Sequence, residues 1–234
     1  MTEEVTFDKN GSGTYSLNVD MGQMMSMMKG MDKGKENDSL KVDKKPEKKD
    51  TIISVADILE KNKDSLKNLS KEEKEALYAL KDAKIHIDLD EAKGKMLMQY
   101  IIPFNNVNDL SNVNDKLKKL NSLNKKKKNN IDDLEKSMPD AKVQYTFNKH
   151  KFRRIVTPAA KPKEKDSVKK DDAKMQQMLG MFKYKLVYHF PYRIKSVSYK
   201  DALLTADGKT LIIDMPMDKL VENPKLLDFE VKFE

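Results

Sequence analysis

The feature that most constrains the fold is a strict alternation of apolar and polar residues in the last third of the chain. The terminal run LLDFEVKFE (226–234) places four apolar side chains on one side, namely Leu227, Phe229, Val231 and Phe233. The run FKYKLVYHF (182–190) alternates in the same way. A period of two is typical of a strand that buries one face and exposes the other. The sequence therefore predicts antiparallel sheet with one polar face.

Two hairpins and several further strands follow from local signals. Asn10-Gly11-Ser12 separates the strand candidates 4–9 and 13–20, and Asn-Gly between alternating segments is a strong hairpin signal. A second hairpin is expected where Lys149-His150 separates 143–148 from 151–157. The remaining strand candidates are 85–90, 95–102, 193–199 and 210–215. Pro103 and Pro216 are expected to end the strands that precede them.

Helices are expected where capping residues precede apolar residues at helical spacing. Ser54 with Asp57, and Ser70 with Glu73, match the capping-box pattern and predict a pair of short helices within 54–82. A further helix is expected at 110–120, after a cap at Asn106, and a short one at 217–223.

The stretch MGQMMSMMKGM (21–31) contains six methionines. On a helix they fall within one arc of about 160°, which predicts a helix that packs its methionine side against the protein. An apolar groove for a partner and a soft-metal site are the alternatives. No histidine is near in sequence, which argues against metal.

The methionine pattern occurs twice, which suggests an internal duplication. Residues 21–29 align with 175–183, and shorter echoes align 6–9 with 146–149 and 92–95 with 206–209. We expect an α+β fold in which antiparallel sheet packs against amphipathic helices, with two divergent copies of a unit that contains ββα. The first unit would span 1–121 and carry the helix pair 54–82 as an insertion. A lysine-rich linker would span 122–140, and the second unit 141–234. Chance similarity between low-complexity segments is the alternative.

Three lysine-rich segments lack hydrophobic periodicity and are expected to be surface loops: 32–50, 121–130 and 158–172. The chain has a net charge of +8, but its only arginines are Arg153, Arg154 and Arg193. Nucleic-acid readers usually rely on the planar fork of arginine, so this composition argues against them. The absence of cysteine excludes disulfides and thiolate metal sites.

No signature of catalysis is present. His86, Asp88 and Asp90 share one strand face and could contribute to a divalent-metal site, although a solvated face is the preferred interpretation. His150 and His189 belong to no nucleophile motif, and no phosphate or dinucleotide loop occurs. The aromatic face of 182–190 is expected to be core, with a stacking platform for single-stranded nucleic acid as the alternative. The sequence therefore predicts no enzyme, catalytic residue, cofactor or metal, and identifies no ligand-binding residue.

The stretches TFNKHKFRRIV, YHFPYRIKSVSYKDALLTADGKTLIIDMP and NPKLLDFEV resemble uncharacterised surface or periplasmic lipoproteins of Bacteroidetes-type bacteria. The earlier stretches GSGTYSLNVDMGQMM and TIISVADILEKNKDSL are similar to the same group. The resemblance implies a non-catalytic, exported protein of the cell envelope, periplasmic or at the outer membrane. Family members are anchored through a lipid-bearing cysteine that follows a signal peptide, and this chain shows neither.

The partner implied by the resemblance is a membrane, reached through that anchor, together with an unidentified protein or polymer. The lysine-rich surface would suit acidic lipid headgroups. The alternative function is that of a cytoplasmic, basic nucleic-acid-binding module.

Overall fold

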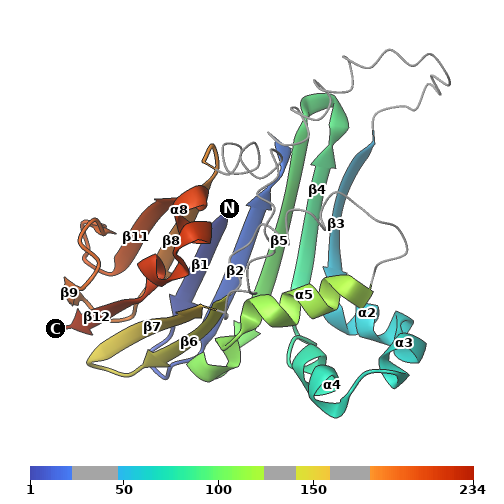
Figure 1. Cartoon of the computed structure of the whole chain (residues 1–234), viewed down its shortest axis with the longest axis horizontal. Coiled ribbons are helices and arrows are strands. Elements are labelled where there is room, and N and C mark those ends of the chain that lie inside the picture. The colour runs from blue at the N-terminus through green and yellow to red at the C-terminus, as the bar shows by residue number, and fades with distance from the viewer. Residues whose placement is uncertain (23–46, 124–140, 159–179) are drawn as a thin grey trace, which may run out of the picture.

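The structure is a computed structural model, and it describes residues 1–22, 47–123, 141–158 and 180–234. The described part is built from two β-sheets and a set of short helices (Figure 1). The α+β class with antiparallel-rich sheet is thus as the sequence predicts.

The larger sheet has eight strands in the order β10-β11-β8-β1-β2-β5-β4-β3. In that order the strands are β10 (Leu203–Leu204), β11 (Thr210–Pro216), β8 (Lys183–His189), β1 (Thr2–Phe7), β2 (Gly13–Asp20), β5 (Lys95–Phe104), β4 (Lys84–Asp90) and β3 (Lys48–Ser54). Neighbouring strands pair antiparallel except β1 and β8, which are parallel. This parallel pair joins a strand from the start of the chain to a strand from its last third within one sheet.

The smaller sheet has four strands in the order β6-β7-β12-β9. They are β6 (Ala141–Phe147), β7 (Lys151–Pro158), β12 (Phe229–Phe233) and β9 (Ile194–Val197). The described α-helices are α2 (Val55–Lys61), α3 (Lys63–Lys67), α4 (Lys71–Tyr78), α5 (Val113–Leu123) and α8 (Met217–Glu222). Short 3-10 turns are η1 (Glu91–Lys93), η2 (Val107–Leu110) and η3 (Pro224–Leu227).

One face of the eight-stranded sheet is covered by two different layers (Figure 1). The four-stranded sheet lies over the part that contains β1 and β8, where an aromatic cluster joins the two sheets. Phe7 of β1 stacks on Phe147 at a centroid distance of 4.9 Å, and Phe190 lies 5.0 Å from Phe233. Helix α5 covers the other part, where the Tyr100 hydroxyl of β5 donates to Oδ1 of Asn121 at 3.1 Å. Between two apolar layers, aromatic side chains bury large areas, so these contacts hold the layers together.

The first hairpin is confirmed and shows why glycine is required in it. Gly11 has a φ of +85°, a conformation that favours glycine. Gly13 begins β2, and a Cβ there would lie 1.9 Å from the Thr6 carbonyl oxygen. Any larger residue at Gly13 would therefore push the two strands apart.

Several predicted elements are confirmed. Ser70 forms a capping box with Glu73 at the start of α4, and Asn106 does the same with Asp109 at η2. The second hairpin, β6–β7, is present. Strand β8 buries Tyr184, Leu186 and Tyr188, and Phe190 directly after it is buried too, as expected of a core face.

Other predictions are wrong in detail. Residues 48–50 belong to strand β3 and not to a loop, because pairing with β4 compensates for their polar composition. Ser54 makes no side-chain cap, and the helix expected to follow it is broken at Asn62 into α2 and α3. Pro103 does not end β5. It pairs with Thr14 of β2, and the strand continues to Phe104.

The two methionine-rich stretches fall largely outside the described residues, and the predicted helices there lie outside them too. Met21 directly follows β2 and is buried. Its amide donates to the Met96 carbonyl of β5 at 2.8 Å. The predicted duplication stays a prediction, and so do its unit boundaries.

Candidate functional site

Two charged side chains are buried between the sheets, and both come from strands. Glu3 lies on the inward face of β1 with Val5 and Phe7, and its side chain is 1% exposed. Arg154 lies on the inward face of β7 with Phe152 and Val156, and its side chain is 4% exposed. Strand alternation places both where apolar residues are normally found. Burying a charge is costly unless partners compensate it, so their contacts need to be accounted for.

The Glu3 carboxylate is held by tyrosine hydroxyls from both sheets. Tyr184 of β8 donates to Oε2 at 2.6 Å, Tyr188 of β8 donates to Oε1, and Tyr145 of β6 donates to Oε1 at 3.3 Å. Hydrogen bonds to a carboxylate are stronger than neutral ones. Glu3 is therefore tied to its own sheet through β8 and to the four-stranded sheet through β6.

The Arg154 guanidinium lies beside this carboxylate but is held less tightly. Its Nη2 is 3.6 Å from Oε2 of Glu3, and its Nη1 donates to the Leu227 carbonyl at 2.9 Å. Its Nε is buried and has no hydrogen-bond partner among the described residues. Burial lowers the pKa of Arg154, but the charge of Glu3 and the nearby tyrosines raise it by more. The pKa is therefore well above the ordinary value, and the guanidinium stays charged.

Burial also raises the pKa of the surrounding phenols. The pKa values of Tyr184 and Tyr188 lie well above the ordinary value, through desolvation first and the Glu3 charge second. The same two causes raise the pKa of Tyr145 and of Tyr15. At neutral pH these groups are therefore hydrogen-bond donors and not bases. The Tyr15 hydroxyl is buried without a hydrogen-bond partner among the described residues.

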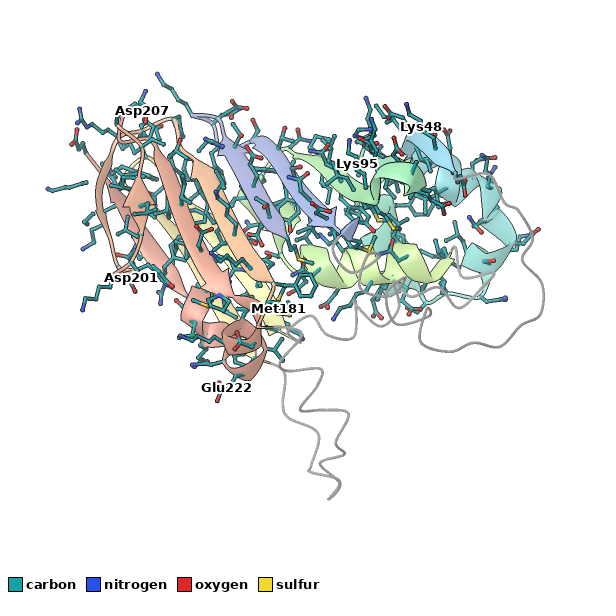
Figure 2. The ribbon with its side chains drawn as sticks, turned by 90° about the horizontal axis from the view of Figure 1, so that it is seen from above. Lys48, Lys95, Met181, Asp201, Asp207 and Glu222 are labelled. Carbon is teal, nitrogen blue, oxygen red and sulfur yellow. The ribbon has the colours of Figure 1, made fainter. Side chains whose placement is uncertain are left out.

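A pocket opens beside Arg154, and we call it the Arg154 pocket. Its volume is about 30 Å³. Helices α5 and α8, turn η3 and strands β6, β7 and β8 contribute its lining. Its apolar wall includes Val143, Val156, Met217, Leu220 and Leu227. Its polar groups come from Asn114, Lys118, Arg154 and Tyr184. Helix α8, which contributes Met217 and Leu220 to the lining, ends at Glu222, which is labelled in Figure 2.

Asn112 positions one wall of this pocket. It has a φ of +55°, which asparagine tolerates better than most residues, and its amide donates to the Val143 carbonyl at 3.0 Å. This bond ties the start of α5 to β6, so that Asn114 and Lys118 of α5 face the strand that carries Val143.

The arrangement suits binding better than bond cleavage. The buried acid, Glu3, is engaged by three hydroxyl donors, so it is a poor acceptor for a substrate proton. The pocket offers instead a cation, a phenol and an apolar wall, which fix the position of a ligand.

The histidine and aspartates that share one face of β4 do not converge. His86 Nε2 lies 2.8 Å from Oδ1 of Asp50, and Asp88 pairs with Lys95. Asp90 is buried, and its Oδ1 accepts from the Lys93 amide at 3.1 Å as the cap of η1. Figure 2 shows the labelled Lys48 and Lys95 at this end of the sheet. Within residues 1–22, 47–123, 141–158 and 180–234, no group of three potential metal ligands occurs.

His189 is the centre of a second polar group, on the outward face of the eight-stranded sheet. Its Nε2 is 3.0 Å from Oε1 of Glu4, and its Nδ1 is 3.0 Å from Oγ1 of Thr210. An acid, an imidazole and a hydroxyl in series can activate a nucleophile. However, the side chains of His189 and Glu4 are 36% and 43% exposed, and none of these residues lines the Arg154 pocket. His150 lies in the β6–β7 turn, where its carbonyl accepts from the Phe233 amide.

The sequence-based interpretation did not single out Glu3, Arg154 or the pocket.

No helix in the described part of the chain is long and apolar enough to cross a membrane. No protein-family model matches the chain, and comparisons with curated proteins and with solved structures find no match either.

Proposed function

We propose that this chain is a non-catalytic binding protein and that its ligand enters the Arg154 pocket. The observation that carries the proposal is the composition of the pocket. A mostly apolar wall surrounds a buried guanidinium whose Nε has no hydrogen-bond partner among the described residues. Pockets of this kind, with few polar groups in an apolar wall, are typical of small-molecule sites.

A rigid surround supports this proposal. The pocket wall is formed where both sheets and two helices meet, and Arg154 is fixed by the Leu227 carbonyl and by Glu3. A site on packed strands loses little conformational entropy when a ligand binds. Such a rigid site favours ligands that carry one particular small chemical group over a wide range of ligands.

The test is a titration that follows side-chain methyl groups by NMR. We would add butyramide and, separately, sodium butyrate, and follow the methyls of Val143, Val156 and Leu227. The proposal predicts saturable shifts at these methyls for at least one probe, and none at Leu77, which lies in the core outside the pocket lining. Absence of saturable shifts at the pocket methyls with both probes would refute it.

A pair of adjacent substitutions supplies the matched control. Ala141 lines the pocket and is half-buried, whereas its neighbour Lys142 is exposed and points to the other side of β6. Ala141→Leu should narrow the pocket and weaken binding of the probe at least about fivefold, because a ligand needs the space that the larger side chain fills. Lys142→Leu should leave binding unchanged.

We also propose that the natural protein is an exported, lipid-anchored protein of the bacterial cell envelope. The resemblance of several stretches to envelope lipoproteins supports this address. The test is metabolic labelling of the full gene product with radioactive palmitate, followed by membrane fractionation. Incorporated label in the membrane fraction is expected, and an unlabelled protein in the cytosolic fraction would contradict the proposal.

A further inference from the structure

Not every N–H donor of Arg154 has a hydrogen-bond partner among the described residues. A guanidinium has five N–H donors and no acceptor. Nη1 uses one on the Leu227 carbonyl, and Nη2 faces Glu3 at 3.6 Å, which is longer than the usual distance of about 2.8 Å for a charged hydrogen bond. The buried Nε has no partner among the described residues. A buried donor without an acceptor is costly, so an acceptor in the pocket would be favoured.

The Glu3 carboxylate does not accept from the unpartnered Nε of Arg154, because tyrosine hydroxyls already donate to both of its oxygens. Both of its oxygens accept from phenols, with Tyr188 and Tyr145 on Oε1 and Tyr184 on Oε2. The three phenols therefore stabilise the carboxylate, and Nε of Arg154 remains without a hydrogen-bond partner among the described residues.

The ionisable groups of the pocket wall are all cationic or neutral. They are Arg154, Lys118 and the phenol Tyr184, and no carboxylate lines the pocket within the described part of the chain. Glu3 does not line the pocket, and its carboxylate accepts hydrogen bonds from the tyrosines. Lys118 approaches from α5 and is only half-buried, so a second positive charge stands nearer to solvent. An anion that enters the pocket thus meets two cations.

We propose that the Arg154 pocket selects a small carboxylate with an aliphatic tail. The inference rests on the proposed function above and names the ligand class. The volume of about 30 Å³ has room for about two water-sized groups. It fits a carboxylate group, and the apolar side chains of Val143, Val156 and Leu220 would contact the tail. The planar carboxylate matches the fork of an arginine.

The experiment compares three probes that share a short aliphatic chain and differ in charge: butyrate, butyramide and butylammonium. Each is titrated at pH 7 and equal ionic strength, with the methyl signals of Val143 and Val156 as the readout. Butyrate should bind at least about tenfold more tightly than butyramide, because only the anion interacts with both cations. Butylammonium should bind more weakly than butyramide.

Substitutions on α5 then assign the selectivity. Lys118→Gln should reduce the preference for butyrate over butyramide about threefold and leave butyramide binding unchanged. Lys119→Gln is the matched control, because Lys119 is adjacent and half-buried but does not line the pocket, and it should change neither affinity. The double variant Glu3→Gln/Arg154→Met removes both buried charges together and should abolish the preference. If this variant does not fold, the Lys118 comparison and the wild-type ratio decide the inference.

The outcomes separate the two proposals. Equal affinities for butyrate and butyramide would overturn the carboxylate inference and leave a pocket that binds small neutral molecules. Butyrate shifts confined to surface lysines, without shifts at Val143 and Val156, would also overturn it. Absence of binding by every probe would overturn both the inference and the proposed function.

Discussion

Glu3 and Glu4 are consecutive residues of the same type, but strand β1 places them in opposite environments. The Glu3 side chain is 1% exposed and accepts hydrogen bonds from Tyr145, Tyr184 and Tyr188. The Glu4 side chain is 43% exposed and pairs with His189 on the outward face of the sheet. A single step along a strand therefore turns a surface carboxylate into an element of the core.

The comparison shows how position sets the energetic importance of a charge. Solvent screens an exposed pair, which contributes about 0 to 1 kcal/mol. A buried pair is little screened, and removal of one partner leaves the other uncompensated. Glu3 also bridges the two sheets, through Tyr184 and Tyr188 on one side and Tyr145 and Arg154 on the other. The Glu4 ion pair stays within one sheet, because its partner His189 belongs to the neighbouring strand β8.

The largest expected effect is that of Glu3→Gln. It keeps the shape of the side chain but removes its charge, so Arg154 is left buried without an opposite charge. We expect the free energy of unfolding to fall by about 3 to 5 kcal/mol. Glu4→Gln, the matched control, should lower it by less than about 0.5 kcal/mol. Chemical denaturation of the two variants measures both values, and similar losses would break the comparison.

The tyrosine hydroxyls should give an intermediate effect. Tyr184→Phe removes a donor to Glu3, and we expect a loss of about 1.5 to 3 kcal/mol because the bond involves a charged group. Tyr15→Phe should be neutral or slightly stabilising, since the Tyr15 hydroxyl is buried without a partner among the described residues. Thermal and chemical denaturation should rank the two variants in this order. An equal loss in both would show that the hydroxyls do not act through Glu3.

The smallest effect per residue is expected from alkaline pH. Burial and the Glu3 charge raise the folded-state pKa of Tyr145, Tyr184 and Tyr188 above the unfolded value of about 10. The unfolded chain therefore loses these protons first, and the stability present below pH 10 is lost as the pH rises toward the folded-state pKa. At pH 10 the loss should be about 0.4 kcal/mol for each such phenol.

Absorbance near 295 nm follows tyrosine ionisation directly. The buried phenols should ionise only as the protein unfolds. Reversible ionisation of all tyrosines of the folded chain near pH 10 would contradict the burial of the cluster.

Much of the fold could be predicted because it depends on local patterns. Alternation identified β8 and β12, Asn10-Gly11 identified the first hairpin, and the Ser70–Glu73 box identified the start of α4. These signals lie within a few residues of the structure they specify. The break at Asn62 and the strand β3 could not be predicted in the same way, because pairing and packing with distant residues decide them.

The candidate site was missed because its parts are far apart in sequence. Glu3 and Arg154 have the parity of the apolar residues beside them, Val5 and Phe7 in one strand and Phe152 and Val156 in the other. A charged residue on the apolar face of a predicted strand is thus a usable signal of a buried site. The sequence does not show that the two strands face each other, since this depends on how the sheets pack.

The central claim is that Glu3 and Arg154 act as one unit that joins the two sheets. A double-mutant cycle with Glu3→Gln, Arg154→Met and their combination tests it most directly, with the free energy of unfolding in denaturant as the measured quantity. We predict a coupling energy of about 2 kcal/mol, so that the double variant is more stable than the sum of the single losses implies. Losses that add to within about 0.5 kcal/mol would contradict the claim, because the two residues would then act independently.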